Sequence, residues 1–80
     1  MDPSDKDTIR RNYVRLTEDL DPSDILNSLI QDGIISSDER EKIELRVHTR
    51  KARCESFLET LMRKGPDAFE AFIKALKPTY

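Results

Sequence analysis

Apolar side chains in the last third of the chain recur at helical spacing in two stretches, one on either side of Gly65-Pro66. Gly65 can adopt the left-handed conformation that ends a helix, and Pro66 is tolerated in the first turn of the next helix. Both apolar stripes face inward only if the two helices fold back on each other, so residues 55–76 predict a helical hairpin. Its stripes contain all three phenylalanines of the chain: Phe57, Leu58, Leu61 and Met62, then Phe69, Phe72, Ile73 and Leu76.

A second amphipathic pattern covers residues 4–19 and predicts the first helix. Val14 falls away from its apolar stripe, so a straight helix fits this segment imperfectly. A bend near Asn12 would account for the misfit, although no Pro or Gly marks one. The stripe itself follows the spacing i, i+4, i+7, i+11 and consists of Ile9, Tyr13, Leu16 and Leu20.

Residues 22–31 predict the next helix, which ends at the flexible position Gly33. The tetrapeptide Asp-Pro-Ser-Asp stands before both this helix and the first one, at 2–5 and 21–24, and either its Asp or its Ser can cap free N–H groups. The apolar connector 34–35 should pack into the core. The inward side of this helix consists of Ile25, Leu26, Leu29 and Ile30.

Two capping patterns define the middle of the chain. Ser36 and Glu39 form a capping box that opens a helix running to about Val47, with Ile43 inward. Beyond a break at His48, Thr49 is a suitable N-terminal cap for the helix that runs to about Lys64. Period-two alternation is absent, so the sequence predicts an all-α bundle of five short helices stabilised by packing.

Composition limits the chain to one domain. Eighty residues with 36% apolar content can build one compact core. The single cysteine excludes an internal disulfide, and the longest apolar run is far shorter than the roughly 20 residues of a membrane span. We therefore expect a cytoplasmic protein without a membrane segment.

Residue types that carry out catalysis are present but poorly arranged. Cys54 stands three and four residues before Phe57 and Leu58, which predicts a buried structural thiol. His48 is six residues from Cys54, a poor spacing for sharing a helical face, and the chain has only two glycines, too few for a phosphate-binding loop. We expect no catalytic residue, no metal site and no cofactor in this domain.

Charge is segregated along the chain, although 14 basic against 16 acidic residues leave a net charge of only −2. Residues 21–44 contain seven acids and two bases, whereas residues 46–64 contain six bases and two acids. Arg10, Arg11 and Arg15 add basic charge to the first helix. Two faces of opposite sign on one small domain favour docking with copies or relatives.

A solvated helical surface is the competing interpretation of these charges. Opposite-sign pairs at i, i+4 stabilise helices by roughly 0.2–0.5 kcal/mol each without any partner. The chain contains six such pairs: Asp7/Arg11, Arg15/Asp19, Asp38/Lys42, Lys51/Glu55, Glu59/Arg63 and Glu70/Lys74. The separation of acidic and basic charge onto different helices favours a binding surface, because local i, i+4 pairing does not require that separation.

The chain resembles the caspase recruitment domain (CARD), a branch of the six-helix death-fold superfamily. The most specific motif is Leu58-x-x-Leu61-x-x-x-Gly65-Pro66-x-Ala68-Phe69-x-x-Phe72-x-x-x-Leu76, and it is similar to the helix four–five junction of initiator caspase prodomains and their adaptors. The second helix with its connector, Leu26-x-x-Leu29-Ile30-x-x-Gly33-Ile34-Ile35, and the first helix from Ile9 to Leu16 also resemble this family. The resemblance implies an antiparallel death-fold bundle whose sixth helix, after Lys77-Pro78, is missing or barely begun. The chain would then be the N-terminal part of a longer protein, which could itself be a caspase.

The resemblance also implies homotypic CARD–CARD binding between a basic face from the first and fourth helices and an acidic face from the second and third. The chain departs from the family pattern at Tyr13, Asn27, Arg40 and Glu55. These departures leave open which of the two faces dominates binding, and therefore whether the domain has a caspase-like or a scaffold-like role. The basic face would comprise Arg10, Arg11, Arg15, Arg50, Lys51 and Arg53. The acidic face would comprise Asp24, Asp32, Asp38, Glu39 and Glu41.

These patterns favour a non-enzymatic adaptor module in apoptotic or inflammatory signalling. Its expected partner is another CARD protein, an initiator caspase or a scaffold, and homo-oligomerisation stays open. The alternative is a small helical nucleic-acid-binding domain that uses residues 46–53, which the negative net charge disfavours. A structural spacer domain is the third interpretation.

Overall fold

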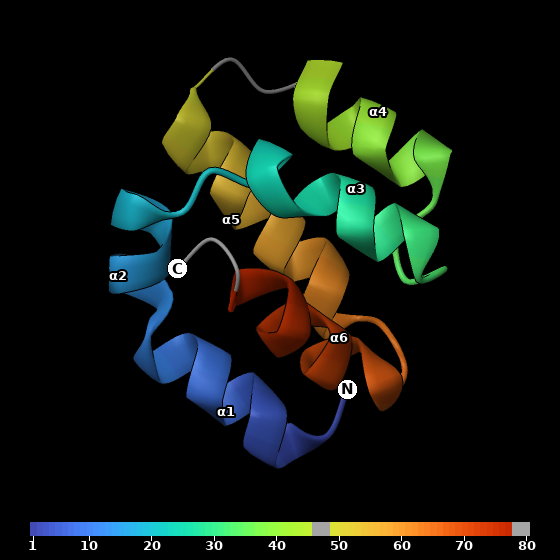
Figure 1. Cartoon of the computed structure of the whole chain (residues 1–80). Coiled ribbons are helices and arrows are strands. Elements are labelled where there is room, and N and C mark those ends of the chain that lie inside the picture. The colour runs from blue at the N-terminus through green and yellow to red at the C-terminus, as the bar shows by residue number, and fades with distance from the viewer. Residues whose placement is uncertain (46–48, 78–80) are drawn as a thin grey trace.

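The computed structural model describes residues 1–45 and 49–77, and within them the chain forms six α-helices (Figure 1). Three positions of the sequence analysis, Arg46, Val47 and His48, lie outside the described residues, as does the segment from Pro78 onward where a further helix was expected. The helices are α1 (Pro3–Arg11), α2 (Tyr13–Asp19), α3 (Ser23–Gln31), α4 (Ser37–Leu45), α5 (Arg50–Met62) and α6 (Asp67–Leu76). The all-α death-fold bundle predicted from the sequence is confirmed.

The predicted first helix is divided at Asn12, which raises the number of helices in the described residues from the expected five to six. Asn12 has φ −105° and ψ 10°, and its side-chain amide donates to the Thr8 carbonyl at 2.8 Å. Polar side chains that bond to the backbone in this way compete with helix propagation. The division explains why Val14 leaves the apolar stripe: it is 68% exposed, while Ile9 and Leu20 are buried.

The predicted N-terminal caps are confirmed by hydrogen bonds, whereas the left-handed conformation expected at Gly65 is not found, since Gly33 is the glycine with a positive φ. The two Asp-Pro-Ser-Asp segments cap with their first aspartate, since Asp2 accepts from the Ser4 N–H at 2.8 Å and Asp21 accepts from the Ser23 N–H at 3.0 Å. Gly33 has φ +77°, a conformation that glycine adopts without steric cost. The remaining caps are reciprocal bonds between Ser36 and Glu39 at 3.0 and 3.1 Å and a 3.1 Å bond from the Ala52 N–H to the Thr49 hydroxyl.

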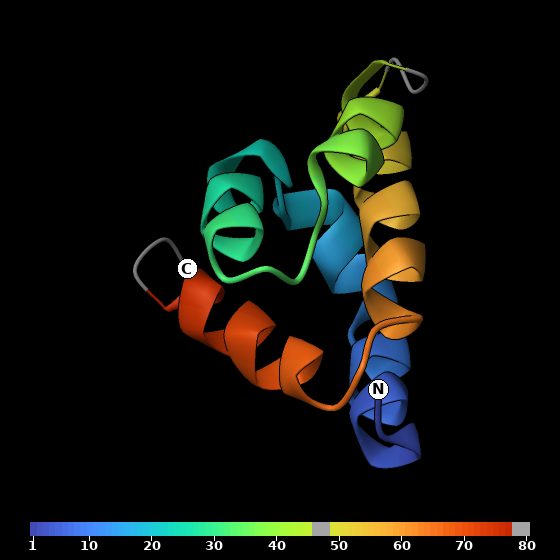
Figure 2. The same ribbon diagram turned by 90° about the vertical axis from the view of Figure 1, so that its right-hand side faces the viewer.

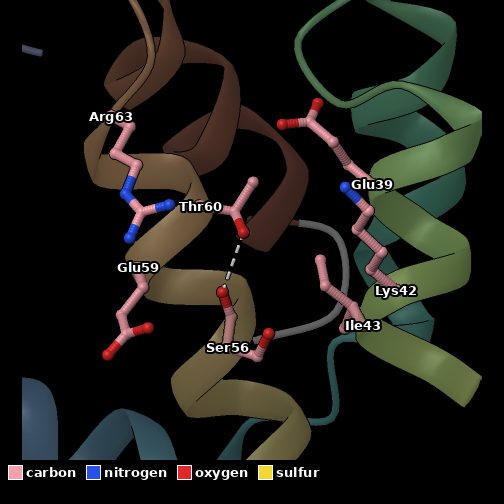
Figure 3. Close-up of a pocket in the computed structure, with 7 residues that line it drawn as sticks. All are labelled: Glu39, Lys42, Ile43, Ser56, Glu59, Thr60 and Arg63. Carbon is pink, nitrogen blue, oxygen red and sulfur yellow. Dashed lines mark hydrogen bonds between the residues drawn. The ribbon is translucent and has the colours of Figure 1, made fainter. Parts of the chain in front are cut away.

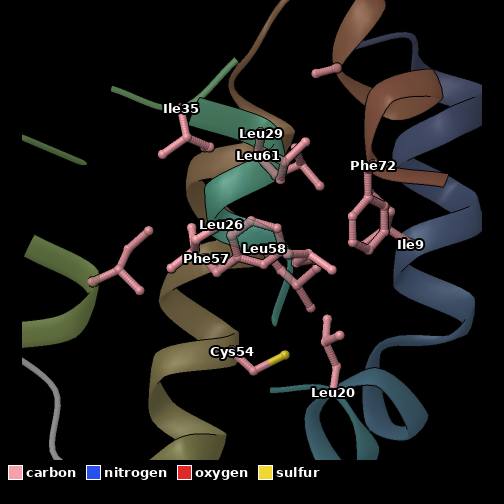
Figure 4. Close-up of a cluster of buried hydrophobic side chains, with 13 residues drawn as sticks. Ile9, Leu20, Leu26, Leu29, Ile35, Cys54, Phe57, Leu58, Leu61 and Phe72 are labelled. Atoms are coloured by element: carbon pink, nitrogen blue, oxygen red, sulfur yellow. The ribbon is translucent and has the colours of Figure 1, made fainter. Parts of the chain in front are cut away.

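The hydrophobic core forms around α5 (Figure 4). Phe57 and Phe72 pack with their ring centroids 5.8 Å apart and their planes tilted by 54°, whereas Phe69 is only half-buried. The buried side chains converge from all six helices and from the connector at Ile35. They include Cys54, Phe57, Leu58 and Leu61 of α5, Ile25, Leu26 and Leu29 of α3, and Ala68 and Phe72 of α6.

The predicted hairpin of α5 and α6 is more open than expected. Figure 2 shows α6 leaving the end of α5 at a wide angle, and α3 occupies the space between the two helices. α6 packs more extensively against α3 than against α5. Helix α3 therefore helps to bury the apolar side chains whose burial the sequence pattern assigned to the α5–α6 hairpin alone.

Candidate interaction surfaces

The arginines of α1 and α2 lie on the outside of the molecule. Arg10, Arg11 and Arg15 are all exposed. Arg11 forms the predicted i, i+4 pair with Asp7 at 3.5 Å, but the two side chains are 78% and 59% exposed. Exposed pairs of this kind are worth roughly 0–1 kcal/mol, so Arg11 can exchange Asp7 for a partner's carboxylate at little cost.

Arg50, at the start of α5, contributes to the fold itself. It is half-buried, and its Nη1 donates to the carbonyls of Thr17 at 3.1 Å and of Leu20 at 3.0 Å. The last carbonyls of a helix have no partner within the helix. Arg50 satisfies two such groups at the end of α2 and thereby fixes α2 against α5.

The other two basic candidates on α5 differ from each other. Lys51 is exposed, whereas Arg53 is half-buried and its Nε is enclosed by protein without a hydrogen-bond partner among residues 1–45 and 49–77. Helix α5, which carries Lys51, packs against both α2 and α4. We name the four exposed bases the basic surface: Arg10, Arg11, Arg15 and Lys51.

The acidic candidates on α3 and α4 are mostly exposed. We name the four exposed carboxylates the acidic surface: Asp24, Asp32, Asp38 and Glu41. Glu39 differs because it is half-buried and has internal partners. Its carboxylate accepts from the Lys64 ammonium at 2.6 and 2.5 Å and from the Ser36 N–H at 3.0 Å.

The surroundings of Glu39 change its acidity. Partial burial raises the pKa of this carboxyl, but the hydrogen bonds from Lys64 and Ser36, together with the Lys64 charge, outweigh burial and hold the pKa below its ordinary value of 4.5. Glu39 is therefore ionised near neutral pH and joins α4 to the end of α5.

Asn27 and Arg40, two residues at which the chain departs from the family pattern, contact each other. Arg40 donates to the side-chain oxygen of Asn27 at 2.6 Å, which links α4 to α3, and its Nε lies 3.3 Å from Glu44. A positive side chain is thus held between the two acidic helices. A partner that docks on the acidic surface would meet this guanidinium beside the carboxylates.

The α1 arginines of the basic surface and the α4 carboxylates of the acidic surface lie at different ends of the molecule, whereas Lys51 stands in the first turn of α5, which begins at the α4 end. In Figures 1 and 2, α1 is at one end of the bundle and α4 at the other, with α3 next to α4. Surfaces that are complementary but separated in this way cannot meet within one molecule. They can meet only between molecules, in a heterologous contact.

A cleft of about 360 Å³ separates α4 from α5 (Figure 3). Charges of both signs line it: Glu39 and Lys42 come from α4, and Glu59 and Arg63 come from the end of α5. One of its polar lining groups already has a partner within α5, because the Thr60 hydroxyl donates to the Ser56 carbonyl at 3.0 Å. The lining contains neither a cysteine nor a histidine.

Cys54 is fully buried in the core, as predicted. Its Sγ donates to the Leu16 carbonyl at 3.5 Å, and burial raises the pKa of the thiol to about 11. Residues 1–45 and 49–77 contain no cluster of three His, Cys, Asp or Glu side chains placed to hold a metal ion. In the same part of the chain no helix has the length and apolarity to span a membrane.

The sequence analysis missed the internal roles of Arg50 and Lys64. Arg50 bonds to carbonyls 33 and 30 residues away, and Lys64 bonds to a carboxylate 25 residues away. No spacing rule connects residues so far apart along the chain. The sequence therefore grouped Arg50 with Arg11, and Glu39 with Glu41, on charge alone.

Comparison with known proteins gives two findings. The family model of the caspase recruitment domain matches residues 6–80. Apoptotic protease-activating factor 1 of Danio rerio is 33% identical over 76 residues, which cover 95% of this chain and 6% of that protein. The chain thus spans only a small part of this curated relative.

Proposed function

The chain belongs to the caspase recruitment domain family, and from this premise we propose that it recruits a second CARD protein through its charged surfaces. The domain is a protein–protein interaction module of the kind found in an apoptotic protease-activating factor. In our proposal the basic surface binds the acidic side of a partner CARD, or the acidic surface binds a basic side. An initiator caspase or a scaffold that contains a CARD is the expected partner.

The observation that supports this proposal is the exposure of the α1 arginines and the α4 carboxylates at separate ends of the bundle. Eight of the eleven residues assigned to the two faces are exposed, and the other three are half-buried: Arg50, Arg53 and Glu39. Charges that a protein keeps in solvent and segregates by sign raise association rates and select partners of opposite sign. A purely solvated surface would not require this segregation.

The same observation weakens the nucleic-acid alternative. That alternative relies on the segment 46–53, in which Arg50 donates to the end of α2 and Arg53 is half-buried. Within the described part of the segment, Lys51 is the base that stays exposed. A single exposed lysine is a poor substitute for the several phosphate contacts that DNA binding requires.

We propose that the module is non-enzymatic and acts in the cytoplasm. A lone, buried thiol with a raised pKa is stable in a reducing compartment and is a poor nucleophile. The lining of the charged cleft between α4 and α5 contains neither a cysteine nor a histidine. Binding alone is then the contribution of this domain.

A pull-down with a panel of CARDs from one proteome, repeated with duplex DNA, tests this proposal. We expect binding to at least one CARD, with an affinity that falls as salt rises, because salt screens exposed charges over about 8–10 Å at physiological strength. Duplex DNA should not bind at physiological salt. Binding to DNA without binding to any CARD would overturn the proposal.

A further inference from the structure

The side chain of Arg40 is a cation that the fold holds in one place between α3 and α4. Its Nε lies 3.3 Å from the Glu44 carboxylate, and its Nη1 donates to the side-chain oxygen of Asn27 at 2.6 Å. Figure 1 shows α3 next to α4, and the Asn27–Arg40 hydrogen bond bridges the two helices. Two contacts, one from each helix, therefore fix a long side chain that would otherwise have many rotamers.

The Arg40 guanidinium still has unused hydrogen-bond donors. An arginine side chain carries five N–H donors, and the contacts with Glu44 and Asn27 use two of them. Nη2 has no hydrogen-bond partner among residues 1–45 and 49–77, and unlike Nε of Arg53 it is not enclosed by protein. The Arg40 side chain is 35% exposed, so water reaches the remaining donors in the free domain.

The residues beside this guanidinium are acidic on both helices. Asp24 stands three residues before Asn27 and shares its side of α3. Glu41 follows Arg40 on α4, and both Asp24 and Glu41 are exposed. We name these residues the α3–α4 face: Asp24, Asn27, Arg40, Glu41 and Glu44. The α3–α4 face therefore presents one fixed cation among carboxylates, and its charge pattern is mixed.

We propose that the α3–α4 face binds a partner protein that supplies a carboxylate to Arg40 from within an otherwise basic docking side. The inference rests on the proposed function and deepens it, because it states which partners the acidic side of this domain accepts. A partner whose docking side is basic throughout would place like charge against Arg40, and like charges brought together at an interface weaken binding. Arg40 thus selects among basic partners by requiring one acid.

Loss of water explains why the partner has to provide an acceptor. A protein that covers the α3–α4 face removes solvent from the unused donors of Arg40, and buried donors without acceptors are unfavourable. A carboxylate replaces the lost water best, because its hydrogen bonds to a guanidinium are charge-assisted and can be bidentate. Since Glu44 and Asn27 already hold the side chain, little rotamer freedom is lost when the partner binds.

Arg40→Gln tests this contact with the CARDs recovered from the panel above. The CARDs to use are those that Glu41→Lys no longer binds, because they dock on the acidic side. Arg40→Gln should weaken their binding about tenfold or more, whereas Arg63→Gln, which removes an exposed base outside the α3–α4 face, should bind like wild type. Circular dichroism confirms that both variants fold. Unchanged affinity in Arg40→Gln would overturn the proposal.

A double-mutant cycle separates recognition by Arg40 from a purely structural role. Each carboxylate on the docking side of the recovered CARD is replaced in turn by its amide. One of these replacements should weaken binding to wild type about tenfold but should weaken binding to Arg40→Gln little further. An Arg40 that only joins α3 to α4 would couple to none of the partner's carboxylates, and that result would contradict the proposal.

A pair of short peptides tests the same chemistry without any CARD. Acetyl-Lys-Glu-Lys-amide offers a carboxylate between two ammonium groups, and acetyl-Lys-Gln-Lys-amide is its matched control without that carboxylate. At millimolar concentration the first peptide should shift the Arg40 Nε–H resonance of nitrogen-15-labelled domain at least about twice as far as the second. Equal shifts would overturn the inference. If no CARD docks on the acidic side, the proposed function fails for that side, and the peptide comparison decides the inference by itself.

Discussion

The interior where α5 meets α3 and α6 and the outer surfaces of α1, α2 and α4 are built in opposite ways. In the interior, Phe57, Leu58 and Leu61 are fully buried, and each side chain is surrounded by others of the same apolar kind. On the outer surfaces, the Arg11 side chain is 78% exposed and forms an ion pair with Asp7, one turn away. The interior determines whether the chain folds, and the outer surfaces are free to vary with the partner.

Three half-buried charged residues stabilise the fold in this comparison, although their sequence neighbours are on the outside. Arg50 closes the end of α2, and Lys64 with Glu39 fastens α4 to α5. Charge alone therefore does not assign a residue to the binding surface. The hydrogen bonds that a charged group makes inside the fold distinguish the two roles.

The largest expected effect concerns access to the interior. Cys54 has no exposed surface, so a thiol reagent should reach it mainly when the domain opens. With a stability of about 5 kcal/mol or more for a domain of this size, labelling should be at least about a thousandfold slower in native than in denatured protein. Stopped-flow labelling at equal pH measures this ratio. Fast labelling of native protein would mean that α5 does not present Cys54 to the core.

Truncation of a core ring should have the next largest effect. Phe72→Ala removes the ring that packs on Phe57, and such truncations cost about 3–5 kcal/mol. Phe69→Ala is the matched control, because Phe69 is half-buried on the same helix and should cost clearly less. Chemical denaturation of both variants measures the difference. Equal losses would contradict the assignment of Phe72 to the interior.

Arg50→Met should lower stability by about 1–3 kcal/mol, because it leaves the Thr17 and Leu20 carbonyls without their donor. Lys51→Met is the control on the next residue, which is exposed, and it should change stability by less than about 0.5 kcal/mol. Thermal melts of the two proteins decide this point. If Arg50→Met melts like Lys51→Met, Arg50 belongs to the outer surface after all.

Glu39→Gln should cost about 1 kcal/mol at neutral pH, since a glutamine can still accept from Ser36 but loses the ionic bond to Lys64. The folded-state pKa of Glu39 is lowered, so its contribution is present above the ordinary value of 4.5 and is lost as pH falls through the folded pKa. The stability difference between wild type and Glu39→Gln should therefore shrink below about pH 4.5. A difference that is constant from pH 7 to pH 3 would contradict the Lys64 bond.

Local features of the fold could be predicted from the sequence because short-range rules govern them. The capping box at Ser36 and Glu39, the left-handed Gly33 and the cap at Thr49 each depend on a few adjacent residues. The division at Asn12 was harder to place, because a side-chain amide rather than a Pro or Gly interrupts the helix. The bonds of Arg50 and Lys64 could not be predicted, since they depend on how α2, α4 and α5 pack. The eight exposed residues of the two surfaces stay a prediction until partner binding is measured.

The most direct test of the central claim is the charge reversal Arg11→Glu, with stability and partner binding measured on the same samples. Arg11 lies outside the interior, so the change should alter stability by no more than about 0.5 kcal/mol beyond the loss of the weak Asp7 pair. If Arg11 contacts an acidic partner CARD, the same change brings like charges together and should weaken binding on the order of a hundredfold or more.

Arg63→Glu provides the matched control, because it makes the same change in net charge at an exposed base that lines the α4–α5 cleft. Circular dichroism and titration calorimetry at two salt concentrations complete the experiment. The account predicts that Arg11→Glu folds like wild type and loses its CARD partner, while Arg63→Glu keeps both fold and partner. Wild-type affinity in Arg11→Glu would show that these charges are only a solvated surface, and an equal loss in both variants would show that net charge, not the basic surface, governs binding.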